Sequence, residues 1–154
     1  MKTWKKKILA ATALLLIAGC CIWFNQVDSL KRDNAESMKK AEQDFKLFIE
    51  MSEDIMDGEI ISFDDYTEHY LQLRLRISDW NHFYQRLYQI RNTAGFDTLI
   101  GDFFIDVEEF YFGMIHVYYI KDKKFDEFKS REALLLLEDT MKMIVETTNS
   151  NFPH

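Results

Sequence analysis

Residues that interrupt helices are scarce in this chain. The sequence of 154 residues contains one proline, Pro153, and five glycines. Because proline and glycine are the strongest breakers of regular structure, so low a content indicates long helices. Gly58, at the end of Met56-Asp57-Gly58, and Gly95, at the end of Thr93-Ala94-Gly95, each predict that a helix stops nearby.

The clearest periodicity lies between these two glycines. Ser62, with Asp64 and Asp65 in the following turn, is typical of a helix N-cap, because its hydroxyl can satisfy free backbone N–H groups and the carboxylates complement the helix dipole. Apolar residues then alternate at spacings of four and three, the heptad-like pattern of a helix with one buried stripe. They are Tyr66, Tyr70, Leu73, Ile77, Trp80, Tyr84 and Leu87. On the opposite face, Leu71 and Leu75 predict a contact with a second neighbour or a partner.

A third segment, from about Thr98 to Lys121, is almost wholly apolar and rich in aromatic residues that favour strands. Its few polar residues nevertheless recur at spacings of four and three, within about 80° of arc on a helix, and this favours helix. They are Asp102, Asp106, Glu109, Gly113 and His116. A helix with so narrow a polar stripe is either the most enclosed element of a bundle or a docking surface.

Two further segments complete the expected architecture. Between Asn25 and Asp44 apolar residues are sparse among oppositely charged pairs four residues apart, which predicts a solvated helical stalk. From Phe45 to Met56 the apolar spacing tightens, so the helix joins the bundle there. The last segment, about 125–148, carries four consecutive leucines at 134–137 and closes the bundle, and residues 149–154 are expected to form a frayed tail.

The sequence therefore predicts an all-α fold: a helical bundle of about four helices, preceded by a membrane-anchoring segment and a helical stalk. The expected boundaries are 1–19 for a signal peptide, or 8–24 for an uncleaved membrane anchor, 20–44 for tether and stalk, and 45–150 for the bundle.

The N-terminus has the layout of an export signal. Four lysines, at positions 2, 5, 6 and 7, precede an uncharged apolar run from Ile8 to Gly19. A basic flank is retained in the cytoplasm while the apolar run enters the bilayer, so the rest of the chain is expected on the extracytoplasmic side of the cell membrane.

Ile17-Ala18-Gly19-Cys20 resembles the lipobox of bacterial lipoprotein precursors, a resemblance limited to the signal segment. It implies cleavage before Cys20, lipidation of the Cys20 thiol and a lipid-anchored N-terminus. The apolar run also continues through Cys21-Ile22-Trp23-Phe24, where a lipoprotein usually turns polar. Read without cleavage, Ile8–Phe24 measures about 25 Å as a helix, which suits a short membrane span. Both forms of tether remain open.

Charge and cysteine content narrow the class further. Without the four N-terminal lysines, 15 basic residues face 26 acidic ones, a formal net charge of −11. This negative charge argues against nucleic-acid binding, because nucleic acid is bound by clustered Lys and Arg. The favoured protein partners are basic or neutral. Cys20 and Cys21 are the only cysteines, so no disulfide is expected within the folded domain and packing must hold it together. The length of the chain predicts a single domain.

No pattern of residues predicts catalysis, a cofactor or a metal site. Asp102, Asp106, Glu109 and His116 share one helical face, but di-iron bundle sites need Glu-x-x-His on two helices, and the chain has none. The nearest approach, Asp79-x-x-His82, points away from the seam. His69 with Asp65 one turn earlier is more typical of a rim or capping pair than of proton chemistry. Phosphate-binding loops, nucleophile elbows and Cys-x-x-Cys are absent from the sequence.

We therefore expect a non-enzymatic, membrane-tethered extracytoplasmic module that binds another envelope or extracellular protein, as a complex subunit or as an immunity or exclusion type factor. The alternative is a carrier or sensor that holds a small apolar ligand in an aromatic-lined bundle core, since 15% of the residues are aromatic. The partner and the oligomeric state are left open by the sequence.

Overall fold

The computed structural model describes residues 2–59, 62–91, 99–120 and 123–152. These residues form four helices, α1 (Lys2–Asp57), α2 (Phe63–Arg91), α3 (Leu99–Ile120) and α4 (Lys123–Asn151). No strand occurs within the described ranges. The predicted all-α bundle of about four helices is confirmed.

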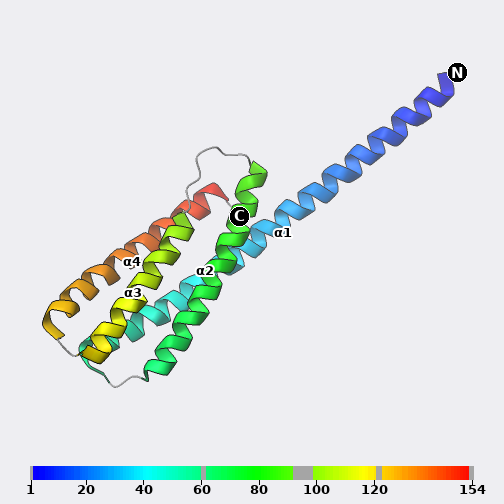
Figure 1. Cartoon of the computed structure of the whole chain (residues 1–154). Helices are drawn as coiled ribbons and strands as arrows, with labels where there is room; N and C mark the ends of the chain where they lie inside the picture. Colours follow the sequence, from blue (N-terminus) through cyan, green and yellow to red (C-terminus); the bar gives the residue numbers. More distant parts are fainter. Residues whose placement is uncertain (1, 60–61, 92–98, 121–122, 153–154) are drawn as a thin grey trace.

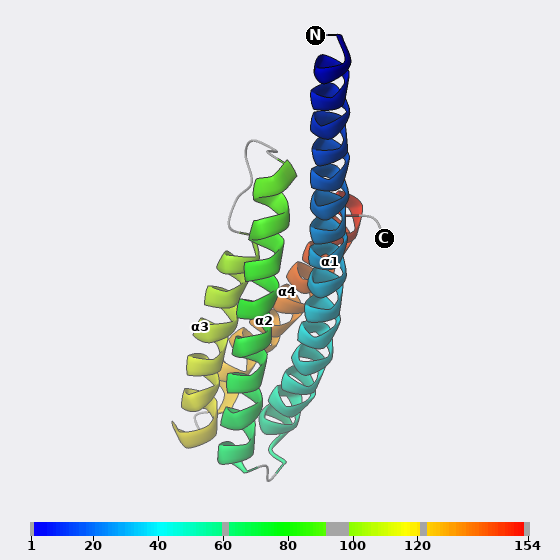
Figure 2. The same cartoon turned by 90° about the vertical axis from the view of Figure 1, so that its right-hand side faces the viewer.

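The helices lie side by side as two antiparallel hairpins, α1 with α2 and α3 with α4 (Figure 1). The N-terminal half of α1 projects alone far beyond the bundle, and Figure 2 shows the same projection from a second side. The end of α2 and the end of α4 lie at the end of the bundle from which α1 projects.

Local sequence signals place the first two helix boundaries. Gly58 has a φ of 84°, a conformation that glycine adopts without strain. The N–H groups of Gly58 and Glu59 donate to the carbonyls of Ile55 and Asp54 at 3.1 and 2.9 Å, the bonding pattern of a Schellman cap. At the start of α2, the Asp65 N–H donates to Ser62 Oγ at 3.4 Å, as expected of an N-cap. The stop predicted at Gly95 lies outside the described residues, and α2 extends to Arg91.

The predicted seam of α2 forms the centre of the core. All seven of its residues are at most 4% exposed. They pack against α1 and α3, and aromatic rings meet at the end of the bundle near Gly58. Tyr70 stacks on Tyr111 with ring centroids 3.8 Å apart, and Phe48 stacks on Tyr66 at 5.2 Å. The heptad-like spacing thus identified the core face of this helix.

The prediction of a solvated stalk to residue 44 is wrong from Leu30 onward. Leu30, Asn34, Met38 and Ala41 are all at most 8% exposed. They recur at spacings of four, four and three, so they form one narrow stripe on α1 that the neighbouring helices cover. The bundle therefore begins near Leu30, and only the part of α1 before it is free of packing.

The predicted frayed tail is also wrong as far as residue 152. Helix α4 continues to Asn151, and the buried ring of Phe152 meets Tyr84 edge-on at 5.2 Å. Asn151 Nδ2 donates to the Tyr84 hydroxyl at 3.2 Å. These contacts tie the end of α4 to the α2 seam.

Candidate functional site

Two surfaces of the bundle have features that packing does not explain. The first is the projecting part of α1. From Ile8 to Gln26 every residue is exposed, including Leu15, Trp23 and Phe24. Among the described residues, α1 is the one helix long and apolar enough to cross a membrane. Exposure of so long an apolar surface to water is unfavourable. Such a surface is typical of a segment that a partner or a bilayer covers.

The predicted lipidation residue lies within this segment. Cys20 and its neighbour Cys21 are both exposed and reduced, and both stand within the continuous helix α1. The helix is unbroken from the apolar run into the bundle.

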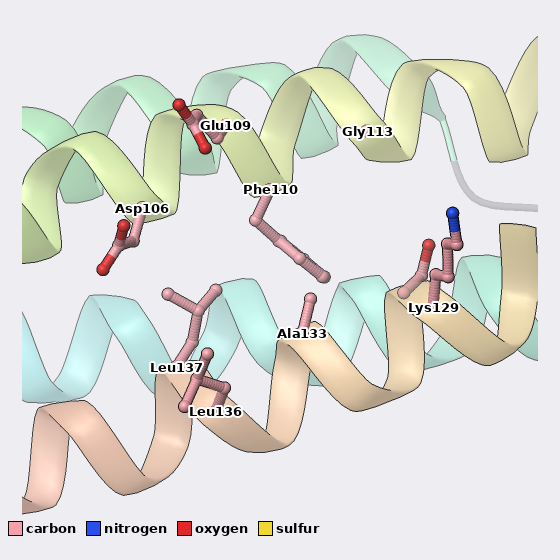
Figure 3. A pocket seen from close by; sticks show the side chains of 9 residues that line it. Asp106, Glu109, Phe110, Gly113, Lys129, Ala133, Leu136 and Leu137 are labelled. Atoms are coloured by element: carbon pink, nitrogen blue, oxygen red, sulfur yellow. The ribbon is translucent and has the colours of Figure 1, made fainter.

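The second surface is a groove of about 490 Å³ between α3 and α4 (Figure 3). Its floor is apolar: Phe110 points from α3 toward Ala133 of α4, beside Leu137. Leu136, which is 68% exposed, extends this apolar surface along α4. The groove is open to solvent along its length and is not enclosed in the core.

The absence of a side chain at Gly113 helps to keep the groove open. A Cβ atom added there would meet nothing within 4 Å, so packing does not demand glycine at this position. Larger residues are therefore expected to fit at position 113, and they would fill the groove instead of disturbing the helix.

Charges of opposite sign stand at the two ends of the groove. Asp106 of α3 lines one end, Glu109 stands on the rim beside Phe110, and Lys129 of α4 lines the other end (Figure 3). Partial burial raises the pKa of Asp106, and the nearby carboxylates of Glu109 and Asp102 raise it further. A positively charged side chain of a partner placed beside Asp106 would therefore stabilise its ionised form.

The groove combines residues that the sequence had singled out with others that it had not. Asp106 and Glu109 belong to the predicted polar stripe of α3, with the exposed Asp102 beside them, while the side chain of His116 lies outside the described residues. The α4 wall was missed, because four consecutive leucines read as core. Leu134 and Leu137 are buried, whereas Leu135 and Leu136 are more than 60% exposed.

The two remaining candidate pairs, His69 with Asp65 and His82 with Asp79, do not line this groove. No hydrogen bond or ion pair links His69 to Asp65, or His82 to Asp79, in the part of the chain that the structure describes. Within the same ranges, no group of three or more His, Cys, Asp or Glu is arranged to hold a metal ion.

The outer face of α3 is apolar as well. Ile105, Phe112 and Tyr119 are each more than half exposed and lie seven residues apart, so they form one stripe along the helix. Helix α3 is therefore packed on one side and exposed on the other, so it is not fully enclosed in the bundle.

No protein-family model, curated protein or solved structure matches this chain.

Proposed function

We propose that this protein is a membrane-tethered extracytoplasmic module that binds another protein through the groove between α3 and α4. The observation that carries the proposal is an open apolar groove, with opposite charges at its two ends, on a bundle whose first helix projects as a bare apolar rod. The projecting part of α1 attaches the protein to the membrane, and the groove between α3 and α4 binds the partner.

Placement outside the cytoplasm rests on the sequence of the projecting helix. Its four N-terminal lysines favour retention of that end in the cytoplasm. Trp23 and Phe24 stand at the other end of the apolar run, where aromatic residues suit the headgroup region. Attachment through a lipidated Cys20 gives the same placement, because the bundle follows the anchor in either case.

The partner segment that fits the groove is an amphipathic helix. Two parallel walls of helix with an apolar floor match the mode in which a third helix lays its apolar face into a groove. A basic residue at one end of that helix would meet Asp106, and an acidic residue at the other end would meet Lys129. The charges therefore fix the direction in which the helix binds, and the acidic balance of the domain favours basic partners.

The second candidate is a carrier or sensor of a small apolar ligand. The groove volume, about 490 Å³, lies in the range of small-molecule sites. The aromatic core, where this ligand was expected, instead contains rings in contact with one another, such as Tyr70 on Tyr111. A small ligand would therefore occupy the groove.

Site-specific photo-crosslinking in native membranes tests the proposal. A photoreactive residue replaces Leu136 in the groove or, as a control of matched exposure, Leu75 on α2, these side chains being 68% and 66% exposed. We expect a protein-sized adduct from position 136 that Gly113→Leu abolishes by filling the groove.

Three results would argue against this function. Adducts from position 75 alone would move the interface to α2, and adducts unaffected by Gly113→Leu would separate it from the groove. A mass increase of a few hundred daltons at position 136 would favour the small-ligand alternative.

A further inference from the structure

Exposed apolar side chains gather on the face of the bundle that α2 and α3 form together. The two helices lie side by side and antiparallel (Figures 1 and 2). Arg74 of α2 crosses to α3, where its guanidinium lies 3.8 Å from a carboxylate oxygen of Glu108 and 5.3 Å from the centroid of the Phe104 ring. Five large apolar side chains on this face are between 47% and 66% exposed: Leu71 and Leu75 of α2, and Ile105, Phe112 and Tyr119 of α3.

The apolar residues surround the ion pair between Arg74 and Glu108. Leu71 stands one helical turn before Arg74, and Ile105 and Phe112 stand one turn before and one turn after Glu108, so they are its neighbours on the helix surfaces. The five residues therefore form one surface, the α2–α3 patch, with a neutral pair of charges at its centre. The groove between α3 and α4 lies on the other side of α3.

The two halves of the α2–α3 patch lie at the same height along the bundle. Besides the central ion pair, the hydroxyl groups of Thr67 and Tyr111 join α2 to α3 at 3.0 Å. Counted from the ion pair, Leu75 is level with residue 107 of α3, and counted from the hydroxyl pair it is level with residue 103. Leu75 is thus level with Ile105.

A two-fold axis parallel to the helices makes this patch complementary to itself. Such an axis places α2 of one copy against α3 of a second copy without a change of height, so Leu75 would pack on Ile105 of the second copy. Leu71, one turn away on α2, would fit between Ile105 and Phe112 of the second copy. The leucines that lie opposite the α2 seam thereby gain a neighbour.

We propose that two copies of this protein pair through the α2–α3 patch, about an axis along the membrane normal. Arg74 of each copy would meet Glu108 of the other, so opposite charges face each other although the domain is acidic. The orientation rests on the membrane attachment in the proposed function: α1 continues unbroken into the bundle, and copies tethered in one membrane therefore stand parallel. The patch is small for an interface, and confinement to a membrane favours pairing by raising the effective concentration of the copies.

Disulfide trapping between differently tagged copies tests the pairing. Full-length chains with Cys20→Ser and Cys21→Ser are reconstituted together in vesicles, one carrying Leu75→Cys and the other Ile105→Cys. We expect the mixed disulfide to form at least several-fold faster than the disulfide of either variant with itself, because the axis sets position 75 against position 105. Leu135→Cys, on the exposed side of α4, replaces Ile105→Cys as the control and should be trapped only at the rate of random collision.

Two results of this trapping would overturn the inference. Equal rates with positions 105 and 135 would show that the copies only collide. A disulfide of Leu75→Cys with itself that forms faster than the mixed one would set α2 against α2 and refute the axis.

An exchange of charges separates a contact between copies from the ion pair within one copy. Arg74→Glu and Glu108→Arg each remove the internal pair. A mixture of the two variants restores opposite charges across the interface, whereas either variant alone places like charges there. We expect trapping of positions 75 and 105 to be several-fold faster in the mixture than in samples where both copies carry the same exchange. Equal trapping in all three samples would refute the contact between Arg74 and Glu108 of different copies.

The outcome can be told apart from failure of the proposed function. Leu136 and Gly113 belong to the groove between α3 and α4, so absence of trapping would leave that groove and its partner unaffected. A photoreactive residue at position 75 should give an adduct with the mass of two copies, and Gly113→Leu should leave it unchanged. An adduct of position 75 with a different protein would assign the α2–α3 patch to that protein and overturn the pairing.

Discussion

The hydroxyl groups of Ser52 and Tyr66 meet in the buried interface between α1 and α2, with their oxygens 2.9 Å apart. Ser52 Oγ donates its proton to the Phe48 carbonyl at 2.7 Å, so Tyr66 is the donor in the pair. Both side chains are fully buried. The pair ties the turn of α1 before Gly58 to the first turn of α2.

Removing the Tyr66 hydroxyl should destabilise the fold modestly. Tyr66→Phe leaves Ser52 bonded to Phe48 but removes one neutral hydrogen bond, for which about 0.5–1.5 kcal/mol is expected. Chemical denaturation of Tyr66→Phe, Ser52→Ala and the double variant gives the coupling energy. A coupling close to zero would show that the two hydroxyls act independently.

Alkaline pH should destabilise the bundle through its buried tyrosines. Burial raises the pKa of Tyr66, Tyr70 and Tyr84, because the phenolate is poorly solvated inside the protein. For an acid whose pKa is raised by folding, the free energy of unfolding does not change with pH below the pKa of the unfolded state, which is about 10 for tyrosine. Above that pH the free energy of unfolding falls. Unfolding free energies measured from pH 8 to 11 should decline, and less steeply in Tyr66→Phe. The exposed Tyr119→Phe serves as the control and should leave the slope unchanged.

Trp80 should be the most costly single residue to remove from the core. It is fully buried on the α2 seam, and Trp80→Ala is expected to cost about 3–5 kcal/mol through the cavity it leaves. Leu75→Ala, on the exposed face of the same helix, should change stability by less than about 0.5 kcal/mol. Similar losses in thermal or urea unfolding of the two variants would show that the seam is not the core of α2.

Substitution of Cys20 should distinguish a lipid anchor from an uncleaved membrane span. If the lipoprotein interpretation is correct, Cys20→Ala should abolish labelling by a fatty-acid analogue and leave a larger, uncleaved species on a gel. Cys21→Ala is the matched control, because it changes the neighbouring thiol and leaves the lipobox-like sequence intact. Unchanged mass and membrane retention in Cys20→Ala would instead establish an uncleaved span.

Local patterns were sufficient for the parts of the fold that depend on one helix at a time. The seam from Tyr66 to Leu87 was predictable because each apolar residue repeats the same face. The end of α1 was predictable because glycine is scarce in the chain and Gly58 is one of the few, and its positive φ is the conformation of a helix cap. The extent of the packed part of α1 was not. Leu30 and Met38 look isolated in sequence, and only the helices packed beside them make so narrow a stripe adequate.

The candidate site was predictable on one side only. The polar stripe of α3 contained Asp106 and Glu109, but nothing in the sequence paired it with α4. Leu136 and Leu137 are neighbours in an unbroken apolar run, and hydropathy treats them alike. The rotation of α4 about its axis buries Leu137 and exposes Leu136, and that rotation is set by contacts between helices.

If the N-terminal segment spans a membrane as proposed, the uninterrupted helix α1 would transmit a tilt of that segment to the bundle. The helix runs from Lys2 to Asp57 without proline and with Gly19 as its only glycine, so it contains no joint between the anchor and the bundle. From Phe24 to Asp57 it measures about 50 Å, and a tilt of about 10° in the bilayer would carry its far end sideways by roughly 9 Å. Bilayer thickness, which governs the tilt of a span, would then set the reach of the bundle toward a neighbour in the same membrane.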